Sequence, residues 1–353
     1  GPKRNERKLP QHAITLAERF HDGGWATIGV TANPNLNAVY DFDQGFDHYR
    51  ETSPLMKEKA ARKVKGGVVV GRAMELVEAQ RNADPERPVY LQLMLVDAHS
   101  PYGKEEVPPA FAEGVPRDVG RYRMGLRRLD KAVDTLQGKL AAQGIDRSNT
   151  LFVLVGDHGE AIWYPEHHGE AHGNYLYDSV VRVPWLMWGA GVGQGVEVDG
   201  LSAQIDLVPT LLSTVGLPHT EELVGSDWSE LLQEGGRTDR KRAFTSTWFR
   251  SSNRAAVYTE RRMCQRDYDP KGTNRRVMTQ RRGELIPPFP DACYDYAGLD
   301  PQFRLPVVDA ELSAAVDAWR AEREAEMRRA TAVSEARVDE ATAAQLEALG
   351  YQE

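Results

Sequence analysis

LFVLVGDHGEAIWYPEHHGEAHGNYLYDSVVRVP, Leu151 to Pro184, is the stretch that contains the clearest strand signal and most of the chemistry-bearing side chains. Its apolar start predicts a strand over 150–155, and this strand ends abruptly at Asp157-His158-Gly159. Functional groups of α/β proteins gather at the carboxyl ends of strands. A carboxylate and an imidazole at this point therefore predict a metal site.

Histidines are concentrated in the same stretch. Four of the nine in the chain, His158, His167, His168 and His172, fall within fifteen residues, a density unusual for a structural loop. Because His167 and His168 are adjacent, only one of them is expected to face the site, and an exposed loop is the alternative for both. Glu160 is expected either to orient His158 or to act as a helix-start carboxylate.

Outward from this stretch, apolar runs alternate with amphipathic ones, which predicts a largely parallel sheet covered by helices. The nearly continuous apolar run at 89–96 is expected to occupy a buried parallel position. Further strands are expected over 25–31, 183–188, 244–259 and 275–279. Helices are expected over 13–22, 71–82, 120–143, 206–215, 308–330 and 339–349. A polar, glycine-containing stretch near 235–240 predicts a boundary between domains of residues 1–237 and 238–353.

Composition and charge narrow the class of protein. The 353 residues are 41% hydrophobic and 27% charged, which is ordinary for a globular protein. A formal net charge of −8 argues against nucleic acid as the main partner. No apolar run approaches the roughly 18–20 residues of a membrane span. The two cysteines permit one disulfide.

The motif GDHGE, followed by AHGNYLYDSVVRVP, resembles the sulfatase branch of the alkaline-phosphatase superfamily. Segments 15–49, 93–102 and 205–218 resemble family segments in the same order, and LEALGYQE resembles a common family ending. The resemblance implies an alkaline-phosphatase-like α/β fold. In that fold a mixed, largely parallel sheet is sandwiched by helices, and a smaller carboxyl-terminal α+β subdomain follows.

One family feature is absent from the sequence. Members carry a nucleophile in a C/S-x-P-x-R motif and a pair of metal-binding aspartates upstream of it. Neither occurs here, because Cys264 and Cys293 lack the following Pro and Arg. The expectation is a family member without its first roughly 100 residues. Its sheet would be incomplete, and the chain would be poorly soluble unless that missing amino-terminal segment partnered it.

The resemblance also implies roles for individual residues. Asp157 and His158 would bind one divalent metal ion, Ca, Mn or Zn, and the imidazole favours Mn or Zn. Without the family context, these two would be a helix N-cap and a helix-start histidine. His99 would work beside the nucleophile and His172 beside the leaving group, with satisfied loop histidines as the alternative. These four side chains are expected to converge on one pocket.

Two further residues of the family stretches are predicted to be structural. Arg182 is expected to pair at the edge of the core, and Asp206 is expected to cap a helix. Together the motifs imply a metal-dependent sulfuric ester hydrolase, acting on an anionic sulfate ester through a formylglycine nucleophile that is not in this chain. The alternatives are a phosphate or phosphonate ester hydrolase, a phosphoethanolamine-type transferase, or a catalytically silent fragment. A periplasmic or extracellular location is favoured by the resemblance alone.

Overall fold

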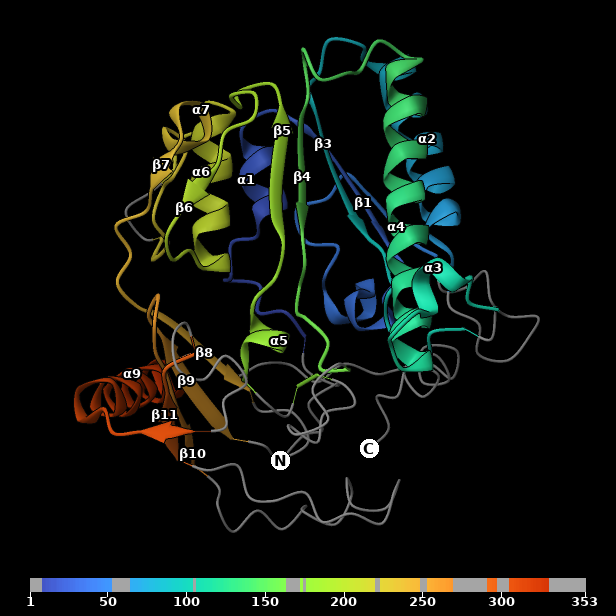
Figure 1. Ribbon diagram of the computed structural model, residues 1–353. Coiled ribbons are helices and arrows are strands. Elements are labelled where there is room, and N and C mark those ends of the chain that lie inside the picture. Colours follow the sequence, from blue (N-terminus) through green and yellow to red (C-terminus); the bar gives the residue numbers. More distant parts are fainter. Residues whose placement is uncertain are drawn as a thin grey trace. The chain divides into compact units, whose positions relative to one another are not determined.

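The computed structural model describes residues 8–52, 64–103, 106–162, 172–173, 176–219, 223–247, 253–268, 291–296 and 305–329. The chain divides into two compact units, unit 1 (residues 1–146 with 332–353) and unit 2 (residues 147–331) (Figure 1). The predicted boundary at residue 237 lies inside unit 2 and stays a prediction. No helix among the described residues is both long enough and apolar enough to cross a membrane.

Unit 1 contains a three-stranded parallel sheet in the order β2-β1-β3. The strands are β1 (Ala26–Thr31), β2 (His48–Glu51) and β3 (Val89–Met94). All six residues of the central strand β1 are buried. The prediction that the 89–96 run is buried was wrong for most of β3, whose residues are half-buried or exposed. The reason is that β3 has only one neighbouring strand, β1, in the described part of unit 1.

Helices accompany the sheet of unit 1, and polar side chains fix the starts of two of them. They are α1 (Leu16–Asp22), α2 (Gly66–Ala83), α3 (Pro109–Ala112) and α4 (Arg117–Ala141), with short 3-10 turns η2 (Pro34–Leu36) and η3 (Ala38–Tyr40). Thr15 caps α1, accepting the Glu18 amide at 3.1 Å and donating its own amide to the Glu18 carboxylate at 2.7 Å. The α2 helix begins at Gly66, earlier than predicted, because the Gly66 amide donates to the buried Asp97 carboxylate at 2.8 Å.

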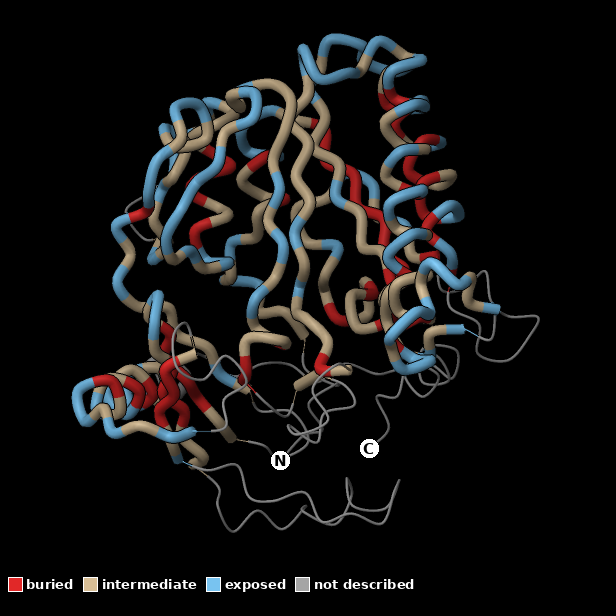
Figure 2. Tube along the Cα trace, viewed as in Figure 1, coloured by how far each residue is buried: buried red, intermediate tan, exposed pale blue. Residues whose placement is uncertain are grey.

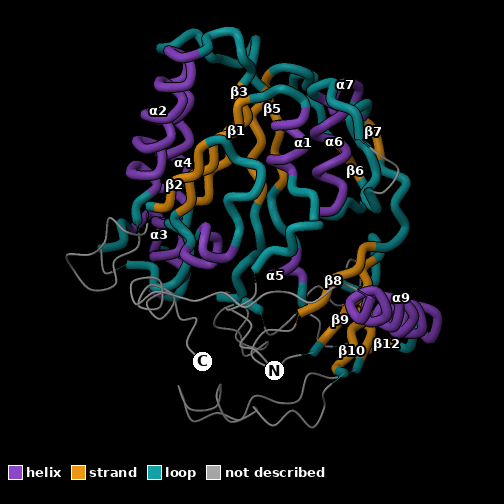
Figure 3. The backbone as a smooth tube through the Cα atoms, turned by 180° about the vertical axis from the view of Figure 1, so that it is seen from behind, coloured by secondary structure: helices purple, strands orange, loops and turns teal. Residues whose placement is uncertain are grey.

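The first half of unit 2 is built around an antiparallel pair, β4 (Leu151–Val155) and β5 (Trp185–Gly189), in which Leu151 lies opposite Gly189. Around this pair are α5 (Asp178–Val181), η6 (Gln204–Asp206), α6 (Leu207–Thr214), α7 (Leu231–Glu234) and the short parallel strands β6 (Val198–Asp199) and β7 (Gly236–Arg237). Parallel and antiparallel pairs therefore both occur in the chain. The predicted mixed α/β architecture is confirmed (Figure 3).

The second half of unit 2 is a five-stranded antiparallel sheet in the order β12-β11-β10-β9-β8, against which a helix packs. The elements are β8 (Ala243–Thr247), β9 (Arg254–Tyr258), β10 (Met263–Asp267), β11 (Ala292–Tyr294), β12 (Pro306–Val307) and α9 (Ala310–Arg329). Buried residues concentrate where α9 meets β9 and β10 (Figure 2). Cys264 and Cys293 face each other on β10 and β11 and form a disulfide. The predicted strand at 275–279 and helix at 339–349 lie outside the described residues.

Asp206 is a fully buried carboxylate that joins three segments of unit 2. One oxygen accepts the amide of Ser226 at 2.7 Å, and the other accepts the amide of Ala203 at 2.9 Å and Arg240 Nε at 3.1 Å. A second nitrogen of Arg240 completes a bidentate pair. The prediction that Asp206 caps the helix over 206–215 was wrong, because its side chain makes no capping hydrogen bond to α6. The carboxylate instead accepts the amide of Ala203, the residue before η6.

Replacing Arg240 by Ala is expected to destabilise unit 2 by about 3–5 kcal/mol, because the Asp206 carboxylate would stay buried with its charge uncompensated. Arg242→Ala is the matched control. Arg242 pairs with Glu311, whose side chain is 81% exposed, and losing that pair should cost about 1 kcal/mol or less. Urea unfolding followed by circular dichroism measures both changes. Equal losses would contradict the role given to burial.

Candidate active site

The backbone at the end of β4 is held by contacts from distant parts of unit 2. Gln204 donates from Nε2 to the carbonyl oxygens of Gly156 and Asp157, at 2.6 and 3.2 Å. The amide of Gly156 donates to the carbonyl of Pro184 at 3.0 Å. The side chain of Asp157 is 57% exposed, and one of its oxygens accepts the amide of His158 at 2.9 Å. The strand end is therefore fixed while the carboxylate faces solvent.

Gly159 occupies a position where a side chain does not fit. Its amide donates to the carbonyl of Val180 at 2.7 Å. A Cβ atom at this residue would lie 2.2 Å from the carbonyl oxygen of Ser179, far inside van der Waals contact. The absence of a side chain therefore lets the strand end pack directly against α5.

His158 and His172, both predicted for the site, stack on each other. Their ring centroids are 3.8 Å apart and the ring planes differ by 26°. Nδ1 of His158 lies 2.9 Å from the carbonyl of Gly159, and Nε2 lies 3.6 Å from an oxygen of Asp157. The neutral tautomer that satisfies the carbonyl carries its proton on Nδ1. The lone pair of Nε2 is then directed toward Asp157.

Glu160 is the carboxylate beside His172. Its side chain is only 5% exposed, and one oxygen lies 3.5 Å from Nδ1 of His172. A carboxylate this close to the ring restricts its orientation. The sequence had offered His158 as the partner of Glu160, and that role stays a prediction.

The loop that carries His172 is anchored in the five-stranded sheet. Thr247 of β8 donates its hydroxyl to the carbonyl of Gly173. Tyr258 of β9 donates to the carbonyl of Leu176 at 2.5 Å. Burial raises the pKa of Tyr258 well above its ordinary value, so its hydroxyl remains a donor. Sequence reasoning missed Thr247, Tyr258 and Gln204 because each acts on a segment far away along the chain.

His99 follows β3 in unit 1, where its Nδ1 contacts the carbonyl of Ser100. Because His99 belongs to the other unit, the predicted convergence of all four site residues stays a prediction. His167 and His168 lie outside the described residues. Three of the predicted residues, Asp157, His158 and His172, are brought together within unit 2.

The pair of Asp157 and His158 suits one divalent cation as two of its ligands. The two potential donor atoms are 3.6 Å apart, the carboxylate is accessible, and Nδ1 of His158 is already engaged by a backbone carbonyl. Within the described ranges, no group of three or more His, Cys, Asp or Glu side chains is arranged to hold a metal ion. Further ligands are therefore required, and the metal stays a prediction.

The family model described as Sulfatase matches residues 2–217. The chain belongs to the sulfatase family. The predicted family and its alkaline-phosphatase-like fold are thereby confirmed. The sulfatase model spans all four residues predicted for the site, together with Glu160 and Gly159.

Individual relatives differ in their stated chemistry. The chain is 28% identical over 215 residues to the low-salt glycan biosynthesis sulfotransferase Agl7 of Haloferax volcanii, covering 58% of this chain and 50% of that protein. It is 28% identical over 92 residues to arylsulfatase K of Homo sapiens, covering 26% and 17%. The match thus spans half or less of the length of these curated relatives.

Solved structures share the fold at low identity. The structure of BT4656 in complex with its substrate D-glucosamine-2-N,6-O-disulfate aligns with a TM-score of 0.65 and 13% identity, covering 92% of this chain and 84% of that one. The lipoteichoic acid synthase LtaP from Listeria monocytogenes aligns with a TM-score of 0.60 and 16% identity, covering 92% and 74%. At these identities the likeness establishes the fold alone.

In this sulfatase-family chain, Gly159→Ala is expected to lower the free energy of unfolding by about 1–3 kcal/mol, because the added methyl overlaps the Ser179 carbonyl. Gly138→Ala is the control. Gly138 lies within α4 with no neighbour near its Cβ direction, so its replacement should be neutral or stabilise by up to about 1 kcal/mol. Denaturant unfolding gives both values. In NMR spectra the ring signals of His158 and His172 should shift in the Gly159→Ala variant, because the two rings move apart. They should stay unchanged in the Gly138→Ala variant. Unchanged signals of both rings in the Gly159→Ala variant would contradict the role of Gly159 in fixing the strand end against α5.

Proposed function

We propose that this sulfatase-family chain forms part of a metal-dependent hydrolase of sulfuric monoesters. The observation that carries the proposal is the stacked pair His158–His172, with Asp157 beside one ring and the buried Glu160 beside the other. Asp157 and His158 form an accessible pair on one side, and His172 with Glu160 behind it lies on the other. The two groups can therefore act on two different oxygens of the same ester.

His172 is the residue proposed to act on the leaving group. Glu160 lies 3.5 Å from Nδ1 of His172, and Nε2 is the ring atom proposed to face the bridging ester oxygen. As the sulfur–oxygen bond breaks, negative charge develops on that oxygen, and donation of the Nε2 proton neutralises it. Glu160 acts through His172 and is therefore a positioning residue.

Asp157 and His158 are proposed to hold the divalent cation, Ca, Mn or Zn, together with ligands from outside this sequence. The Nδ1 contact with Gly159 fixes the His158 tautomer whose Nε2 can coordinate. When bound, the cation supplies charge compensation for the sulfuryl oxygens of the ester. The remaining steps are carried by protein groups.

The nucleophile is proposed to be a hydrated formylglycine in sequence that precedes the matched segment. One of its hydroxyl oxygens attacks sulfur, and the alcohol leaves with the proton from His172. The remaining hydroxyl then loses its proton to a base, the aldehyde reforms, and inorganic sulfate is released. His99 is proposed as that base, since an imidazole is suited to accept a proton near neutral pH.

The substrate class follows from relatives only as a proposal. BT4656 takes a doubly sulfated amino sugar, which supports a sulfated carbohydrate here. Transfer of the sulfuryl group to another acceptor is the second candidate, favoured by the similarity to the sulfotransferase Agl7. The upstream nucleophile separates sulfuryl from phosphoryl chemistry, because Cys in C-x-P-x-R indicates the first and Thr the second. The product, inorganic sulfate or a sulfated acceptor, separates hydrolysis from transfer.

The chain alone is expected to bind a divalent ion weakly and to hydrolyse no aryl sulfate, because it supplies two metal ligands and no covalent nucleophile. Restoring the upstream segment should bring tight metal binding and turnover together. In the restored protein, Asp157→Ala should abolish both, and His172→Ala should lower kcat by about 10²–10⁴-fold. Glu160→Gln should lower kcat by about 10-fold or more.

Asp199→Ala, which removes an exposed carboxylate on β6, is the control and should leave metal content and kcat unchanged. Aryl-sulfate hydrolysis and metal content are measured in parallel on each variant. Full activity of residues 1–353 alone would show that the catalytic residues are misassigned. Metal binding in the restored protein without turnover of sulfate or phosphate esters would favour a catalytically silent relative.

A further inference from the structure

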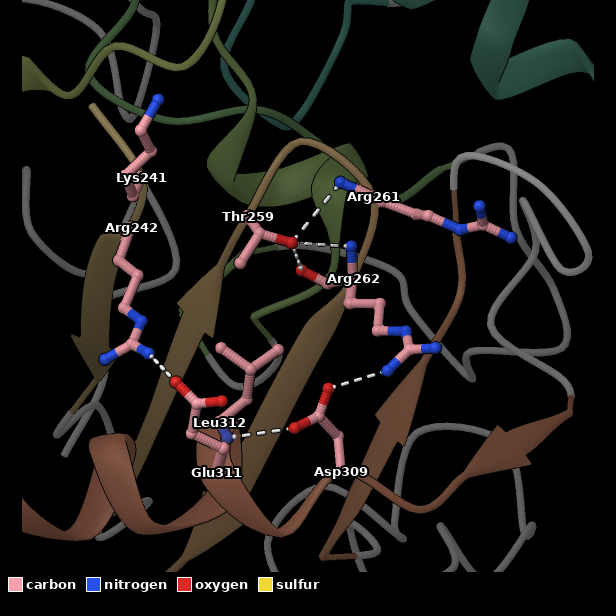
Figure 4. Close-up of a pocket in the computed structure, with 8 residues that line it drawn as sticks. All are labelled: Lys241, Arg242, Thr259, Arg261, Arg262, Asp309, Glu311 and Leu312. Carbon is pink, nitrogen blue, oxygen red and sulfur yellow. Dashed lines mark hydrogen bonds and ion pairs between the residues drawn. The ribbon is translucent and has the colours of Figure 1, made fainter. Parts of the chain in front are cut away.

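A second pocket lies in unit 2, formed by the first turn of α9, the turn between β9 and β10, and the residues just before β8 (Figure 4). Its volume of about 400 Å³ falls within the range of small-ligand sites. The residues that line it are Lys241, Arg242, Thr259, Arg261, Arg262, Asp309, Glu311 and Leu312. None of them belongs to the candidate active site.

The pocket is cationic in an acidic protein. Four lining side chains are Lys or Arg and two are Asp or Glu, which gives the lining a net charge of +2, whereas the chain carries −8. Among the described residues, no carboxylate lies within ion-pair distance of Lys241. Local positive charge of this kind attracts anions against the overall field of the protein.

Hydrogen bonds and ion pairs hold the arginine side chains in place but occupy only some of their N–H donors. Arg262 donates to Asp309 at 2.9 Å, Arg261 donates from Nε to the buried Asp295 at 2.8 Å, and Arg242 pairs with Glu311. Each guanidinium has five N–H donors, so these contacts leave donors for a ligand. Figure 4 shows Arg242 and Arg262 reaching the first turn of α9 from two sides, with Leu312 between their carboxylate partners.

Rigid backbone supports these side chains. The amide of Arg262 donates to the Thr259 hydroxyl at 2.8 Å, and the Thr259 amide donates to the Arg262 carbonyl at 2.8 Å. Asp309 caps α9 by accepting the Leu312 amide at 3.0 Å. That hydrogen bond, together with Arg262, lowers the pKa of Asp309, so this carboxylate stays charged and keeps Arg262 in position. A site fixed in advance loses little entropy when a ligand binds.

We propose that this pocket binds the sulfate or carboxylate group of an acidic sugar unit, as a secondary site for the sulfated carbohydrate of the proposed function, on which this inference rests in part. The free cationic donors bind the anionic group. The carboxylate of Asp309 accepts ligand hydroxyl groups, and the nearly buried Leu312 offers apolar contact to ring C–H groups. A pocket with both charges therefore favours a hydroxylated anion over a purely apolar or cationic ligand.

Binding is measured by calorimetry on the 353-residue chain carrying Asp157→Ala, which removes the candidate metal ligand from the readout. The probes are N-acetylglucosamine 6-sulfate, glucuronic acid, uncharged N-acetylglucosamine, and inorganic sulfate at matched ionic strength. Lys241→Gln with Arg242→Gln should weaken binding of the acidic sugars about tenfold. Glu311→Gln, which removes an exposed competing carboxylate, should tighten it severalfold.

Lys131→Gln with Lys139→Gln is the charge-matched control, because both lysines are exposed on α4 of the other unit. It should leave affinity unchanged. Equal weakening by the control, no effect of the Lys241–Arg242 change, or equal affinity for uncharged N-acetylglucosamine would overturn the proposal. Inorganic sulfate bound as tightly as the sulfated sugar would overturn the sugar component. The tighter of the two acidic sugars identifies the anion.

The two proposals fail separately. Acidic-sugar binding that depends on Lys241 and Arg242, in a restored protein that hydrolyses no sulfate ester, would support the pocket and refute the proposed function. Hydrolysis of a sulfated oligosaccharide with the KM unchanged by the Lys241–Arg242 change would support the function and refute the pocket.

Discussion

The hydrogen bond from the Gly159 amide to the Val180 carbonyl is the contact on which the candidate active site depends. It fixes the end of β4 against α5, at a distance that excludes a Cβ atom. His158 precedes this contact in sequence, and its ring is held by the Gly159 carbonyl. His172 reaches the same place from a loop anchored in another sheet by Thr247 and Tyr258. Two independent anchors thus set the stacking of the two rings.

The sequence predicted the features of this arrangement that depend on neighbouring residues. It did not predict the contacts between residues far apart in the chain. The apolar run before Asp157 predicted β4, and the family resemblance predicted that His158 and His172 share a site. The Glu160–His172 contact was not predicted, because a carboxylate two residues from one histidine gives no sign that it faces another. The antiparallel pairing of β5 was not predicted either, because a short apolar run indicates a strand without specifying which neighbour it pairs with.

The starts of the helices show the same difference between local and long-range determinants. The capping box at Thr15 and Glu18 is a local signal, and α1 begins where that signal lies. The start of α2 depends instead on the Asp97 carboxylate, which follows β3 and accepts the Gly66 amide. When the capping carboxylate follows a distant strand, the sequence around the helix start contains no capping signal. The predicted start was therefore late, while the helix as such was correctly identified.

Both sites of unit 2 use a carboxylate to hold a nitrogen donor, but they differ in burial. Glu160 is nearly inaccessible, so water screens its contact with His172 little. Glu311 is largely exposed, so water and salt weaken its pairing with Arg242. A buried carboxylate suits an imidazole that must keep one orientation while it gives up a proton. An exposed one can yield its arginine to an incoming anion, which is the property a binding pocket needs.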